Sequence, residues 1–268
     1  LACATILCAG CASKDDSHPA AEPRFPVRTT ESFGVDVTEI EGTLDESVYM
    51  GALNERGNHR LVLRKRMDDG EEVTIEPATP REYLKLRAEG YCAMSTFDIT
   101  MESFFIRRTR PLIHLSYAKP SEKSYVSDLR LDEIDAGTLP GVWFHLGEYP
   151  ESPFATLTDY DPEFRVEDPL AESLTIWCGT VVNTFDVVAW GDFDGDGIED
   201  VLLSYGFLVT DGTWRGYGHV FLTRLTPEGP LTGDTWVEYK PGRWQWATFG
   251  GEARQAREDE ARRRLVGE

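Results

Sequence analysis

The stretch DVVAWGDFDGDGIEDVLLSY, which covers residues 186–205, is the most informative part of the chain about its fold. Two largely apolar runs, Asp186–Trp190 and Val201–Leu208, stand on either side of a segment made largely of Asp and Gly. Apolar runs bounded by turn-forming residues are typical of β-strands. The segment Asp192–Asp200 between them therefore predicts a tight connection that joins two neighbouring strands.

The aspartates of this connection follow a fixed spacing. Counted from the first aspartate, the carboxylates occupy positions 1, 3, 5 and 9, at Asp192, Asp194, Asp196 and Asp200. Calcium is a hard cation that takes roughly six to eight oxygen ligands, and alternate residues of a tight loop can direct their oxygens to one centre. Position 7 is Ile198, which offers its backbone carbonyl while its apolar side chain is free to enter the core.

A cation also explains how the acidic side chains tolerate one another. Two carboxylates about 4 Å apart repel by roughly 4 kcal/mol at an effective dielectric constant of about 20. Gly195 and Gly197 permit the backbone angles that a sharp loop requires. We therefore predict a Ca²⁺ site whose ligands are Asp192, Asp194, Asp196, Ile198 and Asp200. The alternative is an Asp- and Gly-rich surface turn that holds no metal.

The loop differs from an EF-hand, because position 12 is Leu203, where an EF-hand has a bidentate Glu. It resembles instead the FG-GAP/VCBS type of repeat, whose DxDGDGxxDL-like loop joins two strands of a propeller blade. The resemblance covers roughly Val187–Gly218 and implies that the four aspartates and the carbonyl of Ile198 bind calcium. Residues Leu157–Phe164, the nearest candidate for a second copy, lack the glycines. A propeller requires several blades, so a single calcium hairpin in another β-architecture is expected.

Further strand-like runs occupy much of the remaining chain. Turn signals such as MDDGEE (residues 67–72) separate them and indicate hairpins. Strands are predicted at Phe33–Ile40, Arg60–Arg66, Glu72–Glu76, Phe97–Thr100, Phe104–Arg108, Leu112–Tyr117, Leu129–Ile134, Leu174–Cys178 and Gly218–Leu225. The expected fold class is mainly β, with α+β left open: antiparallel sheets and one or two short helices within residues 33–250.

Two segments have helical signals. Thr79 is a good N-cap, Pro80 suits the first helical position, and Gly90 would end that helix. The segment Gly251–Glu268 has several acidic residues that precede an arginine by four positions, which supports a charged helix. Because this tail has almost no apolar stripe, a disordered tail is the alternative.

The first residues of the chain resemble a secretion signal. Residues 1–10 are small and apolar, as at the end of a signal peptide. Ala9-Gly10-Cys11 resembles a bacterial lipobox, in which the cysteine is acylated after cleavage, although Cys8 stands where Leu is usual. Residues 11–32 are rich in Ser, Pro and charge, as a flexible tether would be. We therefore expect lipidation at Cys11 and anchoring to a bacterial membrane through that lipid.

Cleavage before Cys11 would leave two further cysteines, Cys92 and Cys178. In an oxidising periplasm these two could form a disulfide, which would stabilise the fold by about 4 kcal/mol. The alternative is a pair of buried thiols, since free cysteine is among the most buried residue types.

The composition restricts the classes of partner. With a net charge of −20 and a pI of about 4.6, the chain would repel nucleic-acid phosphates. The sequence contains no run of about 18 apolar residues, so it predicts no membrane-spanning helix.

Trp244 and Trp246 alternate as strand neighbours and could stack on a sugar or a peptide, although such residues more often cover a core.

No catalytic constellation is evident, because the five histidines are scattered and no nucleophile, phosphate-binding or zinc motif occurs. His114, within PLIHLSY, is expected on a strand rather than at a metal. The favoured function is that of a non-enzymatic envelope lipoprotein, outer-membrane or periplasmic, with structural calcium and a glycan or protein partner. The alternatives are a secreted polysaccharide hydrolase with a calcium-supported loop, and an adhesin with further calcium repeats.

Overall fold

The computed structural model describes residues 25–30, 51–54, 60–144, 156–212, 215–240, 243–246 and 251–266. The signal segment, most of the tether with Cys11, and the strand expected at Phe33–Ile40 lie outside these ranges. They stay predictions.

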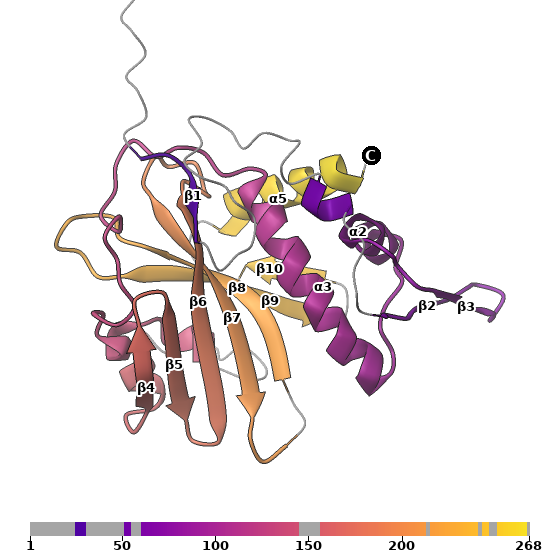
Figure 1. The fold of residues 1–268 in the computed structure, drawn as a ribbon, viewed down its shortest axis with the longest axis horizontal. Coiled ribbons are helices and arrows are strands. Elements are labelled where there is room, and N and C mark those ends of the chain that lie inside the picture. Colours follow the sequence, from indigo (N-terminus) through magenta and orange to yellow (C-terminus); the bar gives the residue numbers. More distant parts are fainter. Residues whose placement is uncertain are drawn as a thin grey trace, which may run out of the picture.

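An eight-stranded antiparallel sheet dominates the described part of the chain (Figure 1). Seven strands follow one another across it in the order β10 (Arg243–Trp246), β9 (Thr232–Lys240), β8 (Arg215–Thr223), β7 (Asp200–Val209), β6 (Val181–Gly191), β5 (Ser173–Cys178) and β4 (Arg165–Leu170). The short strand β1 (Arg28–Thr29) pairs with β6. The fold class is therefore mainly antiparallel β, as predicted, and the sheet is not a closed propeller.

The quoted stretch forms the central hairpin of this sheet. Strands β6 and β7 pair from Val181↔Val209 to Gly191↔Asp200, so the Asp- and Gly-rich segment connects their ends. A bulge between Val187 and Ala189 interrupts the register. At this bulge β1 joins the sheet, where the backbone N–H of Thr30 donates to the carbonyl of Val188 at 3.0 Å.

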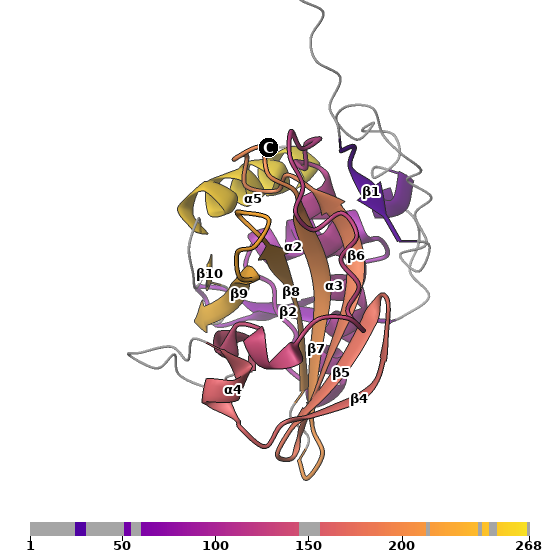
Figure 2. The ribbon, with the colours of Figure 1, turned by 90° about the vertical axis from the view of Figure 1, so that its left-hand side faces the viewer.

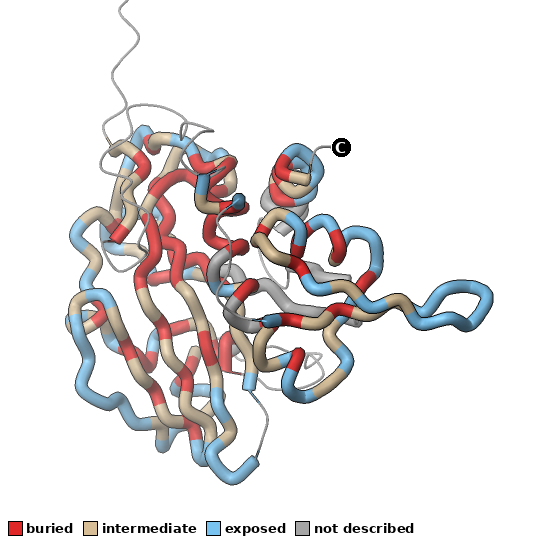
Figure 3. Tube along the Cα trace, turned by 45° about the vertical axis from the view of Figure 1, so that its right-hand side comes forward, coloured by how far each residue is buried: buried red, intermediate tan, exposed pale blue. Residues whose placement is uncertain are grey.

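A second, two-stranded sheet projects from the body of the molecule. It consists of β2 (Leu63–Arg66) and β3 (Glu72–Ile75), with the MDDGEE turn between them, which confirms the predicted hairpin. Gly70 has a φ of +87°, a conformation that favours glycine. Figure 3 shows that the tip of this hairpin is exposed.

Three strand predictions are wrong: Phe97–Thr100, Phe104–Arg108 and Leu112–Tyr117. One helix, α3 (Thr96–Leu115), contains the first two segments and most of the third, which ends in a turn. Ser95 caps this helix by accepting a hydrogen bond from the backbone N–H of Asp98 at 3.0 Å. Phe105 and Leu112, two helical turns apart, are both buried. Short apolar runs fit either a strand or a buried helix, and packing against the sheet selects the helix.

The expected strand at Leu129–Ile134 is also wrong. These residues form turns in the described structure. Leu131 is nevertheless buried, and its backbone N–H donates to the carbonyl of Ala171 at 2.8 Å. The apolar run therefore packs against the domain core without joining a ladder.

The helix predicted after Thr79 is confirmed as α2 (Pro80–Ala88). The hydroxyl of Thr79 accepts a hydrogen bond from the backbone N–H of Glu82 at 3.1 Å, and Gly90 has a φ of +91° beyond its end. The charged tail forms a helix, α5 (Gly251–Val266), which buries Ala261 and Leu265. Two buried apolar side chains thus dock a helix that has no broad apolar stripe.

The sheet separates two clusters of buried side chains. On one face, α3, α2 and α5 pack over residues that include Val188, Leu202 and Phe221. On the other face, α4 (Leu157–Tyr160) and the 3-10 turns η2 (Ala136–Thr138) and η3 (Gly141–Phe144) cover residues that include Phe185 and Leu203. Figure 2 views the sheet from its β4 edge, with α4 beside the strands.

The disulfide considered between Cys92 and Cys178 is not formed, and both cysteines are free. Cys92 is exposed and pairs through its backbone with Arg64 of β2. Cys178, at the end of β5, is buried in the cluster that α4 covers, and burial raises the pKa of its thiol to about 12. Because the two cysteines belong to different layers of the fold, their side chains cannot meet.

Candidate metal centre

The Asp- and Gly-rich loop lies between the end of β6 and the start of β7, against a neighbouring segment of the chain. The backbone groups of Lys119 and Asp192 exchange two hydrogen bonds of 3.0 and 2.8 Å. The carbonyl of Gly197 accepts from the backbone N–H groups of Glu122 and Lys123 at 2.9 and 3.1 Å. These contacts order the loop from one side.

Three of the predicted ligands converge in the structure. Carboxylate oxygens of Asp192, Asp194 and Asp200 lie within 4.8 Å of one another. Asp192 is 4% exposed and Asp200 is 1% exposed, so two of the three carboxylates are almost completely buried. Three carboxylate oxygens at this separation could hold a metal ion, because hard cations are bound by clustered oxygen atoms.

Hydrogen bonds within the loop hold the aspartates in place. Asp192 accepts from the backbone N–H of Gly195 and, at 3.2 Å, from that of Gly197. Asp194 accepts from the backbone N–H of Asp196 at 3.1 Å. The φ angles of Gly195 and Gly197 are +87° and +82°, so these turns require residues that tolerate the left-handed region.

Asp200 closes the loop from its other end. Its Oδ2 accepts a hydrogen bond from the backbone N–H of Phe193 at 3.1 Å. Phe193 is fully buried against Phe221, with ring centroids 5.1 Å apart, whereas Ile198 is half-buried. The side chain of Ile198 therefore enters the core only in part, and Phe193 is the residue that anchors the loop.

Asp196 does not belong to the group of three, although its carboxyl interacts with that group. Its Oδ1 accepts from the backbone N–H of Ile198 at 2.7 Å. Burial and the charges of Asp194 and Asp192 raise its pKa. Asp196 and the carbonyl of Ile198 thus remain predicted ligands, and the structure brings together the other three.

Burial also raises the pKa of Asp192, against the lowering effect of the N–H groups of Gly195 and Gly197. The charge of Asp194 raises it further. A buried carboxylate beside other carboxylates is stabilised in its ionised form by a nearby positive charge. A bound cation would supply that charge.

A positively charged side chain from the C-terminal helix reaches the same loop. A Cβ placed on Gly195 would collide with the guanidinium of Arg257 in α5. The charge of Arg257 also lowers the pKa of Asp192, which places the guanidinium within electrostatic reach of the carboxylate group. Arg257 is more than 50 residues away in sequence, and no local pattern pointed to it.

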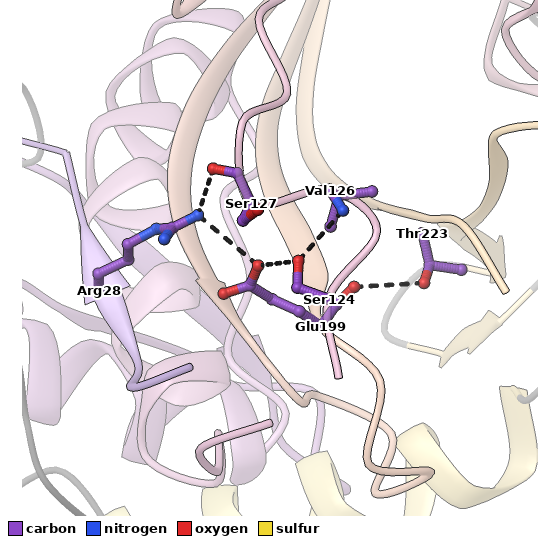
Figure 4. Close-up of polar contacts among 6 residues, drawn as sticks. All are labelled: Arg28, Ser124, Val126, Ser127, Glu199 and Thr223. Carbon is purple, nitrogen blue, oxygen red and sulfur yellow. Dashed lines mark hydrogen bonds and ion pairs between the residues drawn. The ribbon is translucent and has the colours of Figure 1, made fainter. Parts of the chain in front are cut away.

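Glu199 is a second functional candidate that the sequence reasoning missed. Its side chain is completely buried, and Oε2 accepts from the hydroxyl of Ser124 at 2.6 Å (Figure 4). Arg28 lies 3.6 Å from the same oxygen and donates to the carbonyl of Ser127 at 2.7 Å. Burial raises the pKa of Glu199, and the Ser124 hydrogen bond and the Arg28 charge oppose that rise. This network attaches β1 and the segment 124–127 to the residue next to Asp200.

His114 does not lie on a strand, and the expectation that it would is wrong. It belongs to α3, where its Nδ1 lies 2.6 Å from the hydroxyl of Tyr117. Its ring packs edge-on against Phe221 of β8, with centroids 5.1 Å apart. His219 of β8 lies beside it, and both of its buried ring nitrogens have no hydrogen-bond partner in the described structure.

Other predicted features lie where the structure does not describe the side chains. Trp244 and Trp246 are on β10, but their side chains are outside the described part, so the aromatic platform stays a prediction. Among the described residues, no helix has the length and hydropathy of a membrane span. Comparison of the chain with protein-family models, curated proteins and solved structures found no match.

Proposed function

We propose that this protein is a non-enzymatic component of the bacterial cell envelope in which Ca²⁺ has a structural role between β6 and β7. The proposal depends on one observation: the carboxylates of Asp192, Asp194 and Asp200 meet within 4.8 Å, and two of them are buried. Asp192 directly follows β6 and Asp200 begins β7. A cation between them would therefore join the ends of two central strands.

The ligand atoms favour calcium over other common metals. In the described residues this group is made of carboxylates alone, with no histidine or cysteine, as hard cations prefer. The predicted carbonyl of Ile198 and the carboxyl of Asp196 would raise the number of oxygens toward the coordination number of calcium. Magnesium requires a near-ideal octahedron of shorter bonds, which a loop with flexible glycines suits less well.

A structural role fits the surroundings of the loop better than a signalling role. Phe193 anchors the loop in the core, and the buried Glu199 connects it to Arg28 of β1. Closing the loop would thus stabilise the attachment of β1 and of the segment around Ser124. Extracellular calcium is abundant enough to saturate even a weak loop, with Kd values of about 10⁻⁴–10⁻³ M.

Isothermal titration calorimetry with CaCl₂ on chelator-treated protein tests this function. We expect one site on the wild-type chain, and loss of that heat in Asp194→Asn and Asp200→Asn. Asp211→Asn, which changes an exposed turn aspartate, is the matched control and should bind as the wild type does. Equal binding by the wild type and Asp200→Asn would contradict the proposal, as would tighter binding of MgCl₂ than of CaCl₂.

The envelope location is a separate part of the proposal and depends on the lipobox-like Cys11. Expression of the full-length precursor in a bacterium with radiolabelled palmitate should label the wild-type protein in the membrane fraction. The variant Cys11→Ser should lose the label and appear in a soluble fraction. Labelling that persists in this variant would remove lipidation at Cys11, and calcium binding would be unaffected by that result.

A further inference from the structure

A pocket of about 420 Å³ lies where α3 meets the sheet, away from the metal centre. Its lining comes from Thr30 directly after β1, from α3, from the end of β4 and the β4–β5 connection, and from strands β5, β6 and β7. Figure 1 shows α3 crossing the sheet on the β8 side, so that no labelled helix covers the adjoining faces of β5 and β6. Small-molecule sites occupy roughly 300–1,000 Å³, and this pocket is within that range.

The pocket brings together charged groups of both signs that do not neutralise one another. Arg107 of α3, Asp186 of β6 and Glu172 all line it. No ion pair within 4.0 Å connects these three residues, all of which the structure describes. A guanidinium can pair with a negatively charged group of a ligand, and a carboxylate can pair with a positively charged one.

The local contacts hold these groups in place while leaving hydrogen-bonding capacity for a ligand. The guanidinium carbon of Arg107 lies 4.2 Å from the ring centroid of Tyr217, a stacking contact that leaves the in-plane N–H donors free. Oδ1 of Asp186 accepts from the hydroxyl of Ser173 at 2.8 Å. No described donor reaches Oδ2 of Asp186. The pocket therefore offers an oriented donor fork and an oriented acceptor.

We propose that this pocket binds a small zwitterion of the α-amino acid class. The ligand carboxylate would pair with Arg107, and the ligand ammonium would pair with Asp186, with Glu172 adding to the negative potential. Pro111, Val188 and Leu170 contribute apolar surface to the same pocket, so an aliphatic side chain suits it. A simple anion is disfavoured, because two carboxylates face one guanidinium and the chain carries a net charge of −20.

Calorimetry with L-leucine and two matched derivatives tests the proposal on the calcium-loaded protein. L-leucinamide lacks the carboxylate, and N-acetyl-L-leucine lacks the ammonium. We expect L-leucine to bind at one site and each derivative to bind at least tenfold more weakly. L-glutamate, L-lysine and D-glucose complete the set as probes of other ligand charges.

Variants of the two charged partners connect any binding to this pocket. Arg107→Gln and Asp186→Asn should each weaken L-leucine binding at least tenfold. Arg66→Gln on the exposed hairpin and Asp211→Asn in the exposed turn are matched controls that should bind normally. Thermal melts of all four variants show whether each is folded. Since Arg107 is exposed, its substitution should leave the melting temperature unchanged.

Several results would overturn the assignment. No binding of any free amino acid, equal binding of L-leucine and its two derivatives, or preferential binding of D-glucose would each exclude a zwitterion site. Binding of L-leucine that Arg107→Gln and Asp186→Asn leave unchanged would place the site elsewhere. The calorimetry with L-leucine is repeated on chelator-treated protein, so that a failure of amino-acid binding is distinguishable from a failure of the metal centre.

Discussion

The variant Asp200→Asn should have opposite effects on stability with and without calcium. Asp200 is 1% exposed, and Asn keeps its shape and an oxygen that can accept from the backbone N–H of Phe193. The substitution removes one charge from three carboxylates that lie within 4.8 Å of one another. At an effective dielectric constant of about 20, each such pair repels by at least about 3.5 kcal/mol before screening by water and salt.

In the presence of a chelator, relief of this repulsion should raise the melting temperature of Asp200→Asn above that of the wild type. With calcium at about a hundred times its Kd, the wild type gains about 2.7 kcal/mol. For a chain of this size, that corresponds to a rise of about 5–10 °C. Asp200→Asn should gain almost nothing, so the order of the two melting temperatures reverses.

Differential scanning calorimetry in excess EGTA and in millimolar CaCl₂ measures both effects on one instrument. Asp211→Asn removes an equal charge from an exposed turn and should keep the full calcium shift. A wild-type melting temperature that ignores chelation would refute the metal centre. So would a calcium shift that Asp200→Asn retains.

Three further outcomes follow from individual residues. Arg257→Gln should raise the calcium affinity about threefold or more, because a guanidinium near Asp192 repels the incoming cation. Titration calorimetry measures this affinity, and an unchanged Kd would contradict the prediction. Glu199→Ala should lower the free energy of unfolding by about 3 kcal/mol in urea, because it removes the carboxylate that pairs with Arg28 and accepts from the hydroxyl of Ser124. A loss under about 0.5 kcal/mol would show that the network contributes little. Burial holds the pKa of His219 well below 6.5, so its contribution to stability is present above pH 6.5 and falls by about 1.4 kcal/mol per pH unit below it. His219→Phe should therefore make the free energy of unfolding less dependent on pH between pH 6.5 and 5. Identical pH profiles of the wild type and the variant would contradict this assignment.

Local chemistry explains why several elements were predictable. The MDDGEE turn and the Thr79 cap act within a few residues, and both occur in the structure where the sequence predicted them. The loop from Asp192 to Asp200 depends on the same kind of short-range information. The hydrogen bonds that the aspartate side chains accept from backbone N–H groups inside the loop span at most five residues, except for the contact between Asp200 and Phe193, which spans seven.

Long-range packing explains the failures. The runs around Phe105 and Leu112 have no periodicity strong enough to separate a strand from a buried helix, and the face of the sheet that α3 covers decides between them. Cleavage before Cys11 would leave Cys92 and Cys178 as a possible pair, but these two cysteines lie in different layers of the fold. A disulfide depends on a Cα separation that no sequence pattern encodes.

The central β-hairpin, the acidic loop and the oxygen-rich chemistry of that loop could all be predicted from the order of the residues, because residue spacing along a short turn sets which oxygens can meet. Only the tertiary structure decided that Asp192, Asp194 and Asp200 form the close group. It also brought Arg257 from α5 next to Gly195 and Arg28 from β1 next to Glu199. Those partners come from distant parts of the chain, and three-dimensional packing alone makes them neighbours.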